Sequence, residues 1–243
     1  MSINLRRPAF YLTMPQHCNY LPGYWASNLF LDPRARLDGR GYAGLLAKGF
    51  RRSGDFVYRP HCEDCAACVA VRVPVAAFRP DRSQRRNRKR NRDLRVTRVA
   101  PLYRDEHFDL YRRYQQAVHP GGGMDETDTE NYRQFLVCSP VNTFFYEIRC
   151  RGRLLAVAVV DQLPGCLSAV YTFYEPAERH RGLGNYAILW QIEQARAQRR
   201  QWLYLGYWIR NCRKMAYKIR YRPLEGLMDG AWSTLSAPDT RSP

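Results

Sequence analysis

Three cysteines stand at two-residue intervals, as Cys62, Cys65 and Cys68, within the stretch from Tyr58 to Val75. Valine at every second position then predicts a strand immediately after the last cysteine. Two-residue spacing lets neighbouring thiolates turn towards one centre, and it is typical of zinc and iron–sulfur sites. Because regularly spaced cysteines rarely arise from packing alone, we favour an occupied or ancestral soft-metal site over a plain buried turn.

A tetrahedral metal site at this array would need a fourth ligand. The sequence offers Cys18 and His61 as candidates. We therefore expect a site built from Cys18 or His61 together with the array, holding either zinc or an iron–sulfur cluster. The alternative is that the array is the remnant of a lost site.

The chain carries 39 Lys and Arg residues against 22 Asp and Glu, a formal net charge of +17 over 243 residues. This excess requires a polyanionic partner, nucleic acid before an anionic membrane surface. The longest aliphatic run, 154–160, is far too short to span a membrane, and the first residues do not resemble a secretory signal. The eight cysteines do not form a disulfide-type pattern. We expect a reduced, cytoplasmic protein without a membrane partner.

Much of the positive charge lies between Arg79 and Arg98, where ten of twenty residues are Lys or Arg. A run of this density repels itself unless a counter-charge arrives, so we favour phosphate contact over a solvated face. The segment divides the chain. We expect a smaller domain with the cysteine array at 1–78, a basic linker at 79–100, a larger domain at 101–234 and a flexible tail at 235–243.

The larger domain contains three alternating apolar segments, at 143–149, 154–162 and 167–174, with a glycine-containing turn after each of the first two. This pattern predicts an antiparallel meander. Apolar residues at helical spacing predict two helices before it, at 105–118 and 129–137.

The pattern R-x-x-G-x-G follows the third predicted strand, from Arg179 to Gly184, and begins a helix. Such glycines let backbone N–H groups at a helix N-terminus approach an anion. A short strand at 202–206 and a helix at 211–221 come next. This order of elements resembles that of the GNAT acyltransferases. We therefore expect an α+β fold with a GNAT-like acyltransferase core and a smaller N-terminal cysteine-containing domain.

Seven groups of residues, spread over nearly the whole chain, carry a more specific resemblance. They are CNYLPG at 18–23, GFRRSG at 49–54, the cysteine array with RVPV at 58–75, SQRR at 83–86, HPGGGMD at 119–125, YTFYEP at 171–176, and YLGYWI with KMAYK at 204–218. In this order they resemble the aminoacyl-tRNA–protein transferases. These arginyl- and leucyl-transferases extend the N-terminus of proteins bound for degradation.

The resemblance implies an aminoacyl-tRNA donor and a protein N-terminal amine as acceptor, with no cofactor required for the chemistry. The chain lacks a long insertion, and so it resembles the bacterial leucyl-transferases that act on N-terminal Asp or Glu. Three alternatives stay open: an arginyl-transferase of the same class, an acetyl-CoA-dependent GNAT enzyme, and a GNAT-like RNA-binding module without transferase activity.

The family motifs also imply site residues. Catalytic roles, as base or as oxyanion donor, are expected for Asp125, Tyr207 and Tyr217. The expected substrate-binding residues are Tyr171, Tyr174, Gly182, Gly184, Lys214, Lys218 and Arg52. The expected tRNA-binding residues are Arg79, Arg82, Arg85, Arg86, Arg88, Lys89 and Arg90.

Several of these residues have a plainer alternative. The tyrosines could simply pack the core, Asp125 could cap a helix, and Lys218 could neutralise tRNA phosphate. An acidic acceptor requires a cationic pocket, for which the candidates are Arg51, Arg52, Arg72, Lys214 and Lys218, with Lys218 favoured. Tyr24 and Asn185 depart from the family pattern.

Overall fold

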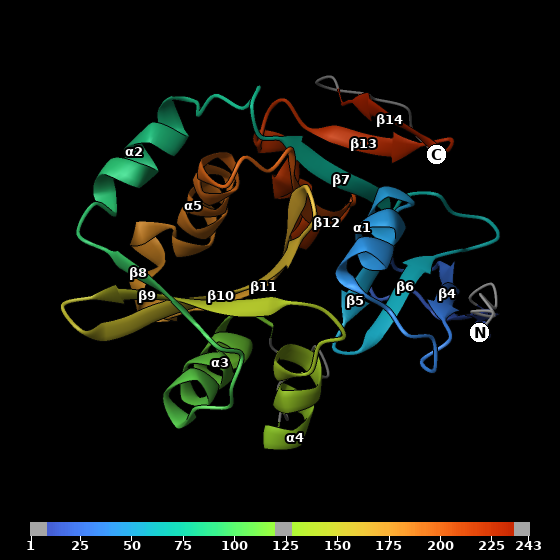
Figure 1. Cartoon of the computed structure of the whole chain (residues 1–243), viewed down its shortest axis with the longest axis horizontal. Coiled ribbons are helices and arrows are strands. Elements are labelled where there is room, and N and C mark those ends of the chain that lie inside the picture. Colours follow the sequence, from blue (N-terminus) through green and yellow to red (C-terminus); the bar gives the residue numbers. More distant parts are fainter. Residues whose placement is uncertain (1–8, 120–127, 236–243) are drawn as a thin grey trace, which may run out of the picture.

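An eight-stranded sheet forms the centre of the described residues, 9–119 and 128–235, in this computed structural model (Figure 1). Across the sheet the strands are β14 (Ala231–Thr234), β13 (Glu225–Met228), β7 (Val69–Pro74), β12 (Trp202–Trp208), β11 (Cys166–Tyr174), β10 (Arg153–Leu163), β9 (Thr143–Cys150) and β8 (Arg95–Val99). Neighbours are antiparallel except β12 and β11, which run parallel. The expected mixture of helices and mainly antiparallel strands is confirmed.

The predicted meander is confirmed as β9, β10 and β11, and β10 is buried along almost its whole length. Side chains of a strand alternate between the two faces of its sheet. Val157 and Val159 pack in the cluster that contains Phe108 and Tyr111 of α3 (Asp105–Val118). On the other face, alternate residues of β10 join the cluster formed with α5 (Leu183–Ala197). Figure 1 shows α5 and α3 on opposite faces of the sheet.

A smaller four-stranded sheet lies at one end of the molecule (Figure 1). Its order is β1 (Phe10–Leu12), β4 (Asn28–Leu31), β6 (Phe56–Pro60) and β5 (Arg51–Ser53), with α1 (Gly39–Ala47) packed beside it. The side chain of Asp38 accepts a hydrogen bond from the Gly41 N–H at 2.7 Å and caps α1, as expected of this residue type. Two short strands, β2 (Gln16–His17) and β3 (Trp25–Ala26), form a separate pair.

The expected division of the chain at residue 78 does not correspond to a break between the sheets. Strand β7 comes from the first segment, yet it lies between β12 and β13 in the large sheet. The strand belongs to the core of the large sheet, because Val71 and Val73 are fully buried in the cluster that this sheet forms with α5. The segment expected to be a linker forms helix α2 (Arg82–Arg90) and strand β8.

The remaining elements are short. They are α4 (Thr129–Tyr132), the π-helical turn η1 (Arg133–Val137), the 3-10 turns η2 (Pro176–Arg181) and η3 (Tyr217–Arg220), and α6 (Arg213–Ala216). No helix among the described residues is long and apolar enough to cross a membrane.

A buried ion pair joins the small sheet to the large one. Arg52 of β5 donates to Asp161 of β10 through Nε at 2.9 Å and through Nη2 at 2.7 Å, and both side chains are fully buried. Thr143 accepts from the same Nη2 at 3.1 Å. The carbonyl oxygens of Gly54 and Cys138 accept from Nη1, at 3.1 and 3.4 Å. The five N–H donors of the guanidinium are therefore all in use.

Replacing Asp161 with Asn should destabilise the fold strongly. The variant leaves a buried guanidinium opposite a neutral amide, and breaking such a pair costs about 3–5 kcal/mol. Urea unfolding measures the loss. Asp32→Asn is the control, because Asp32 pairs at 3.0 Å with the exposed Arg34 and an ion pair at the surface contributes little to stability. Equal losses in the two variants would contradict the structural role of the buried pair.

Candidate active site

A cavity of about 2310 Å³ opens where β11 and β12 separate. The two parallel strands are in register only from Cys166 to Ser168, paired with Trp202 to Tyr204. Beyond that point their carboxyl-terminal halves are unpaired with each other, and both line the cavity, with Tyr171 and Tyr174 on one side and Gly206 on the other. The gap in the sheet is thus a consequence of a short pairing.

Gly206 marks a second irregularity on the β12 side of the gap. Its φ is +70°, and the pairing of β12 with β7 shifts register between Tyr204 and Tyr207. A bulge of this kind bends a strand and increases its local twist. The conformation favours glycine, because a side chain rarely adopts a positive φ.

The glycine turn before α5 lies at another wall of the cavity. Gly182 adopts φ +63°, and a Cβ there would stand only 2.8 Å from the Asn87 side chain. At Gly184 a Cβ would meet the Tyr174 ring at 3.4 Å. Within the described residues no side chain caps the first turn of α5, so its N–H groups are free to meet an anion.

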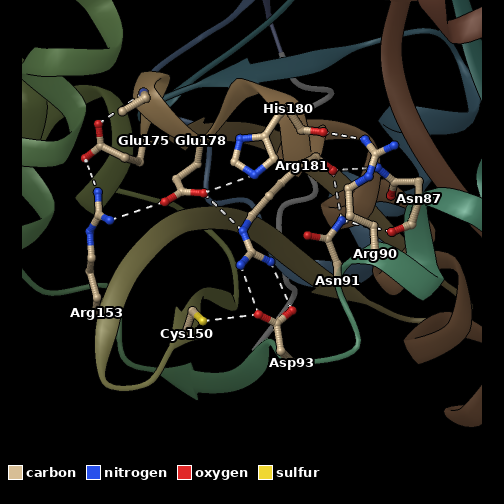
Figure 2. A network of polar contacts seen from close by, with 11 residues as sticks. Asn87, Arg90, Asn91, Asp93, Cys150, Arg153, Glu175, Glu178, His180 and Arg181 are labelled. Carbon is tan, nitrogen blue, oxygen red and sulfur yellow. Dashed lines mark hydrogen bonds and ion pairs between the residues drawn. The ribbon is translucent and has the colours of Figure 1, made fainter.

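Helix α2 holds this glycine turn in place (Figure 2). The Asn87 amide donates to the carbonyls of Arg181 and Gly182 at 2.9 and 3.1 Å, and the Asn91 amide donates to Arg181 at 2.9 Å. Arg90 donates to the carbonyl of His180. The guanidinium of Arg181 forms two 3.0 Å hydrogen bonds with Asp93. The expected linker is therefore part of the site's framework.

Sequence reasoning missed this role of α2. The buried face of the helix consists of amides, Gln84 and Asn87, with Asn91 as its C-cap, at three- and four-residue spacing among the arginines. The spacing of these amides is the signal that the sequence offers for a buried face, because residues three or four positions apart share one face of a helix. It indicates a face that is buried through hydrogen bonds to backbone rather than through apolar contact.

The residues expected to bind tRNA lie mainly on the exposed face of α2. Arg82, Arg86 and Lys89 are exposed and form no ion pair with a described residue. The others are hydrogen-bonded within the protein. Arg79 donates to the carbonyls of Ala76 and Phe78, Arg85 to Pro80 and Arg90 to His180, while Arg88 pairs with Glu193.

The expected aromatic residues surround the gap but differ in availability. Tyr171 accepts a hydrogen bond from Gln115 at 3.2 Å and packs among other rings. Tyr217 is 40% exposed and lines the cavity. Tyr207 is buried, and its hydroxyl donates to the Gly49 carbonyl at 2.8 Å. Because that hydroxyl has a single proton, the geometry gives Tyr207 an anchoring role between β12 and the small sheet.

Asp125 lies outside the described residues, so its expected catalytic role stays a prediction. Arg52 was expected to bind substrate, but its donors are all used within the protein. Asn185, which departs from the family pattern, accepts a hydrogen bond from the Tyr221 hydroxyl at 2.7 Å.

Lys214 and Lys218 both line the cavity, in contrasting surroundings. Lys214 is exposed, whereas Lys218 is 6% exposed. Lys218 Nζ donates to the Tyr207 carbonyl at 2.5 Å and to Met215 Sδ at 3.4 Å. Burial, with a further contribution from the positive charge of Arg51, lowers the pKa of Lys218 to about 7.

The structure brings Cys18 to the cysteine array. Burial raises the pKa of the Cys68 thiol to about 12, and the charges of Cys18, Cys62 and Cys65 act in the same direction. The backbone N–H groups of Tyr20 and Leu21 donate to Cys18 Sγ, both at 3.4 Å. Within the described residues, however, no three His, Cys, Asp or Glu side chains are arranged to hold a metal ion. The zinc or iron–sulfur site stays a prediction.

Residues 106–228 match the family model for the arginine-tRNA-protein transferase C terminus, and residues 16–86 match the model for its N terminus. The chain belongs to this family. It is 53% identical over 232 residues to aspartate/glutamate leucyltransferases of Pseudomonas putida (strain W619) and Pseudomonas entomophila (strain L48), covering 96% of this chain and 99% of each relative. Among solved structures it is similar to L-PGS from Bacillus licheniformis, with a TM-score of 0.43 and 11% identity over 58% of this chain and 45% of that one.

The buried Lys218 should make stability depend on pH. Between about pH 7 and 10.5 the unfolded chain keeps a proton on this amine that the folded protein has lost, so the free energy of unfolding rises with pH across this window. Lys218→Met removes this pH-dependent contribution to the free energy of unfolding. In urea unfolding at pH 7, 8 and 9, the stability of Lys218→Met relative to the wild type should fall as pH rises. Lys48→Met, at an exposed position, should follow the wild type. Parallel curves for wild type and Lys218→Met would contradict the lowered pKa.

Proposed function

We propose that this protein transfers an aminoacyl group, leucine, from aminoacyl-tRNA to the N-terminal Asp or Glu of acceptor proteins. The observation that carries the proposal is the 53% identity, over 96% of the chain, to proteins named aspartate/glutamate leucyltransferase. The cavity supports this function, because cationic residues of α2 and the glycine turn both line its wall.

The core of this transferase is GNAT-like in our proposal. Two features support that assignment. The parallel strands β11 and β12 diverge after three paired residues, and an R-x-x-G-x-G turn introduces the helix that follows. In GNAT enzymes the same two features hold the anionic arm of an acyl donor next to an acceptor amine. Here the donor would be larger than CoA, which suits the additional positive charge of α2.

The donor end of the cavity would accept the 3′ end of the tRNA. The first-turn N–H groups of α5 and the cations Arg86 and Arg90 at the cavity wall suit its phosphates. Tyr174 and Tyr217, which also line the wall, offer rings against which the terminal adenine can stack.

The reaction is an attack by the neutral α-amine of the acceptor on the aminoacyl ester. A C–N bond forms and the ester C–O bond breaks, while the amine proton ends on the departing ribose oxygen. The ester is already activated, so the protein's contribution is orientation, exclusion of water and proton removal. Tyr217, which is 40% exposed and lines the cavity, is our candidate to stabilise the oxyanion or relay the proton through its hydroxyl. Asp125 stays a candidate base.

The added leucine would mark the acceptor for degradation through the N-degron pathway, as the family resemblance implies. A cytoplasmic location belongs to the same proposal. It is supported by the free cysteines, since thiols persist in a reducing compartment.

Incubation with an Asp-starting peptide and one donor at a time tests the function. With leucyl-tRNA, mass spectrometry should show addition of one leucine, and an N-acetylated peptide should stay unmodified because it lacks a free amine. Arginine addition from arginyl-tRNA would favour the arginyl alternative. Acetylation by acetyl-CoA would favour an ordinary GNAT enzyme. Retained tRNA binding without any transfer would favour an RNA-binding module.

The exposed cations of α2 should supply salt-dependent tRNA affinity. Changing Arg82, Arg86 and Lys89 together to Gln keeps a good helix former at each position and removes three charges. The log–log slope of affinity against salt should become shallower by roughly one unit for each phosphate that the helix no longer neutralises. Arg36, Arg40 and Lys48, exposed around α1, give a control triple of equal charge. An identical slope in both triples would show that α2 is only a solvated face.

A further inference from the structure

Two cations meet at the bulge in β12, on the wall of the cavity. A Cβ on Gly206 would lie 3.8 Å from Arg51 Nη1 and 4.0 Å from Lys218 Nζ, so both groups approach the same point. Arg51 comes from β5 and Lys218 from η3, and both line the cavity. Residues from distant parts of the chain therefore concentrate positive charge at one place.

Neither cation has a carboxylate partner among the described residues. Arg51 lies 5.5 Å from the ring centroids of Tyr58 and Tyr207, without an ion pair. Lys218 Nζ contacts a carbonyl oxygen and a thioether sulfur. The adjacent Arg52, by contrast, is paired with Asp161.

The acidic residues that line the same cavity interact with groups other than Arg51 and Lys218. Asp81 accepts from the Gln84 N–H at 2.8 Å and caps α2. Glu130 accepts from the Gln134 side chain at 3.3 Å. Asp55 exerts its charge on Arg52 and Cys138. A guanidinium and an amine in a poorly solvated wall, with no acid to offset them, cost folding energy, and this cost is what lowers the pKa of Lys218. Such an arrangement is typical of a site that receives an anion.

We propose that Arg51 and Lys218 bind the side-chain carboxylate of the acceptor's N-terminal Asp or Glu. The inference rests on the proposed function and identifies the residues that select the acceptor. Arginine offers a carboxylate a fork of N–H donors, and the bound carboxylate would favour the protonated form of the lysine beside it. The rings of Tyr58 and Tyr207 exclude water and so strengthen the attraction.

The position of the pair relative to the donor end agrees with this role. The ring of Tyr174 lies against Gly184 of the glycine turn, and Tyr217 borders the same space. Lys218 Nζ lies 5.9 Å from the centroid of the Tyr217 ring. The two cations and the glycine turn therefore border the same cavity, with Tyr217 next to Lys218. A carboxylate held there leaves the α-amine to face an ester that enters from the turn.

The test compares kcat/KM for Asp-starting and Asn-starting peptides at saturating leucyl-tRNA. Arg51→Gln should lower the value for the Asp peptide roughly a hundredfold, as expected when a desolvated carboxylate loses a charged partner. The value for the Asn peptide should change little, so the Asp/Asn ratio falls. Lys218→Met should act in the same direction. Arg51→Lys, which keeps the charge, should recover part of the loss.

Two controls separate this effect from a general defect. The affinity for leucyl-tRNA should be unchanged in all the variants. Lys48→Gln removes an exposed charge three residues before Arg51 and should leave the ratio as in the wild type. Equal losses on both peptides, or losses that track tRNA affinity, would overturn the inference while the proposed function stands. A wild-type protein that adds leucine to no peptide would overturn the proposed function and, with it, this inference.

Discussion

The short pairing between β11 and β12 is the constraint on which the site depends. Three residue pairs hold these parallel strands together, and β12 then continues as the partner of β7. Strand β7 comes directly after the cysteine array, so the first third of the chain helps to keep the gap open. The segment that follows α2 supplies the glycine turn and β11. The N-terminal segment supplies the strand that borders β12 and, through β5, the cation that faces the gap.

Consecutive arginines of β5 show how strand geometry divides two identical charges between structure and recognition. Side chains of neighbouring residues in a strand point to opposite faces. Arg52 points to Asp161 and has every donor satisfied, whereas Arg51 points to the cavity and tyrosine rings. A shift of register by one residue would exchange these roles. The buried ion pair therefore stabilises the fold and, by fixing the register, also determines which arginine reaches the site.

The sequence predicted the parts of this fold that depend on local periodicity. Alternating apolar residues located the meander, and the glycine pattern located the turn before α5. It did not predict contacts between distant polar groups. The spacing of the amides on α2 indicates a buried face but not that Asn87 donates to the carbonyls at 181 and 182, and Arg51 and Arg52 are chemically identical in the sequence. Hydrophobic patterns carry no information about which backbone carbonyl, or which carboxylate, a polar side chain will meet.

In the proposed function, the positive charge of this chain performs two physically different tasks. The cations of α2 are exposed, and dissolved ions screen their attraction to phosphate beyond about 8 Å at physiological salt. Arg51 and Lys218 act over contact distances in a site walled by tyrosine rings, where screening is weak. Donor capture and acceptor choice therefore respond differently to ionic strength. Salt weakens donor capture, because many dispersed charges attract the polyanion. It largely spares acceptor choice, because one enclosed pair recognises a single carboxylate.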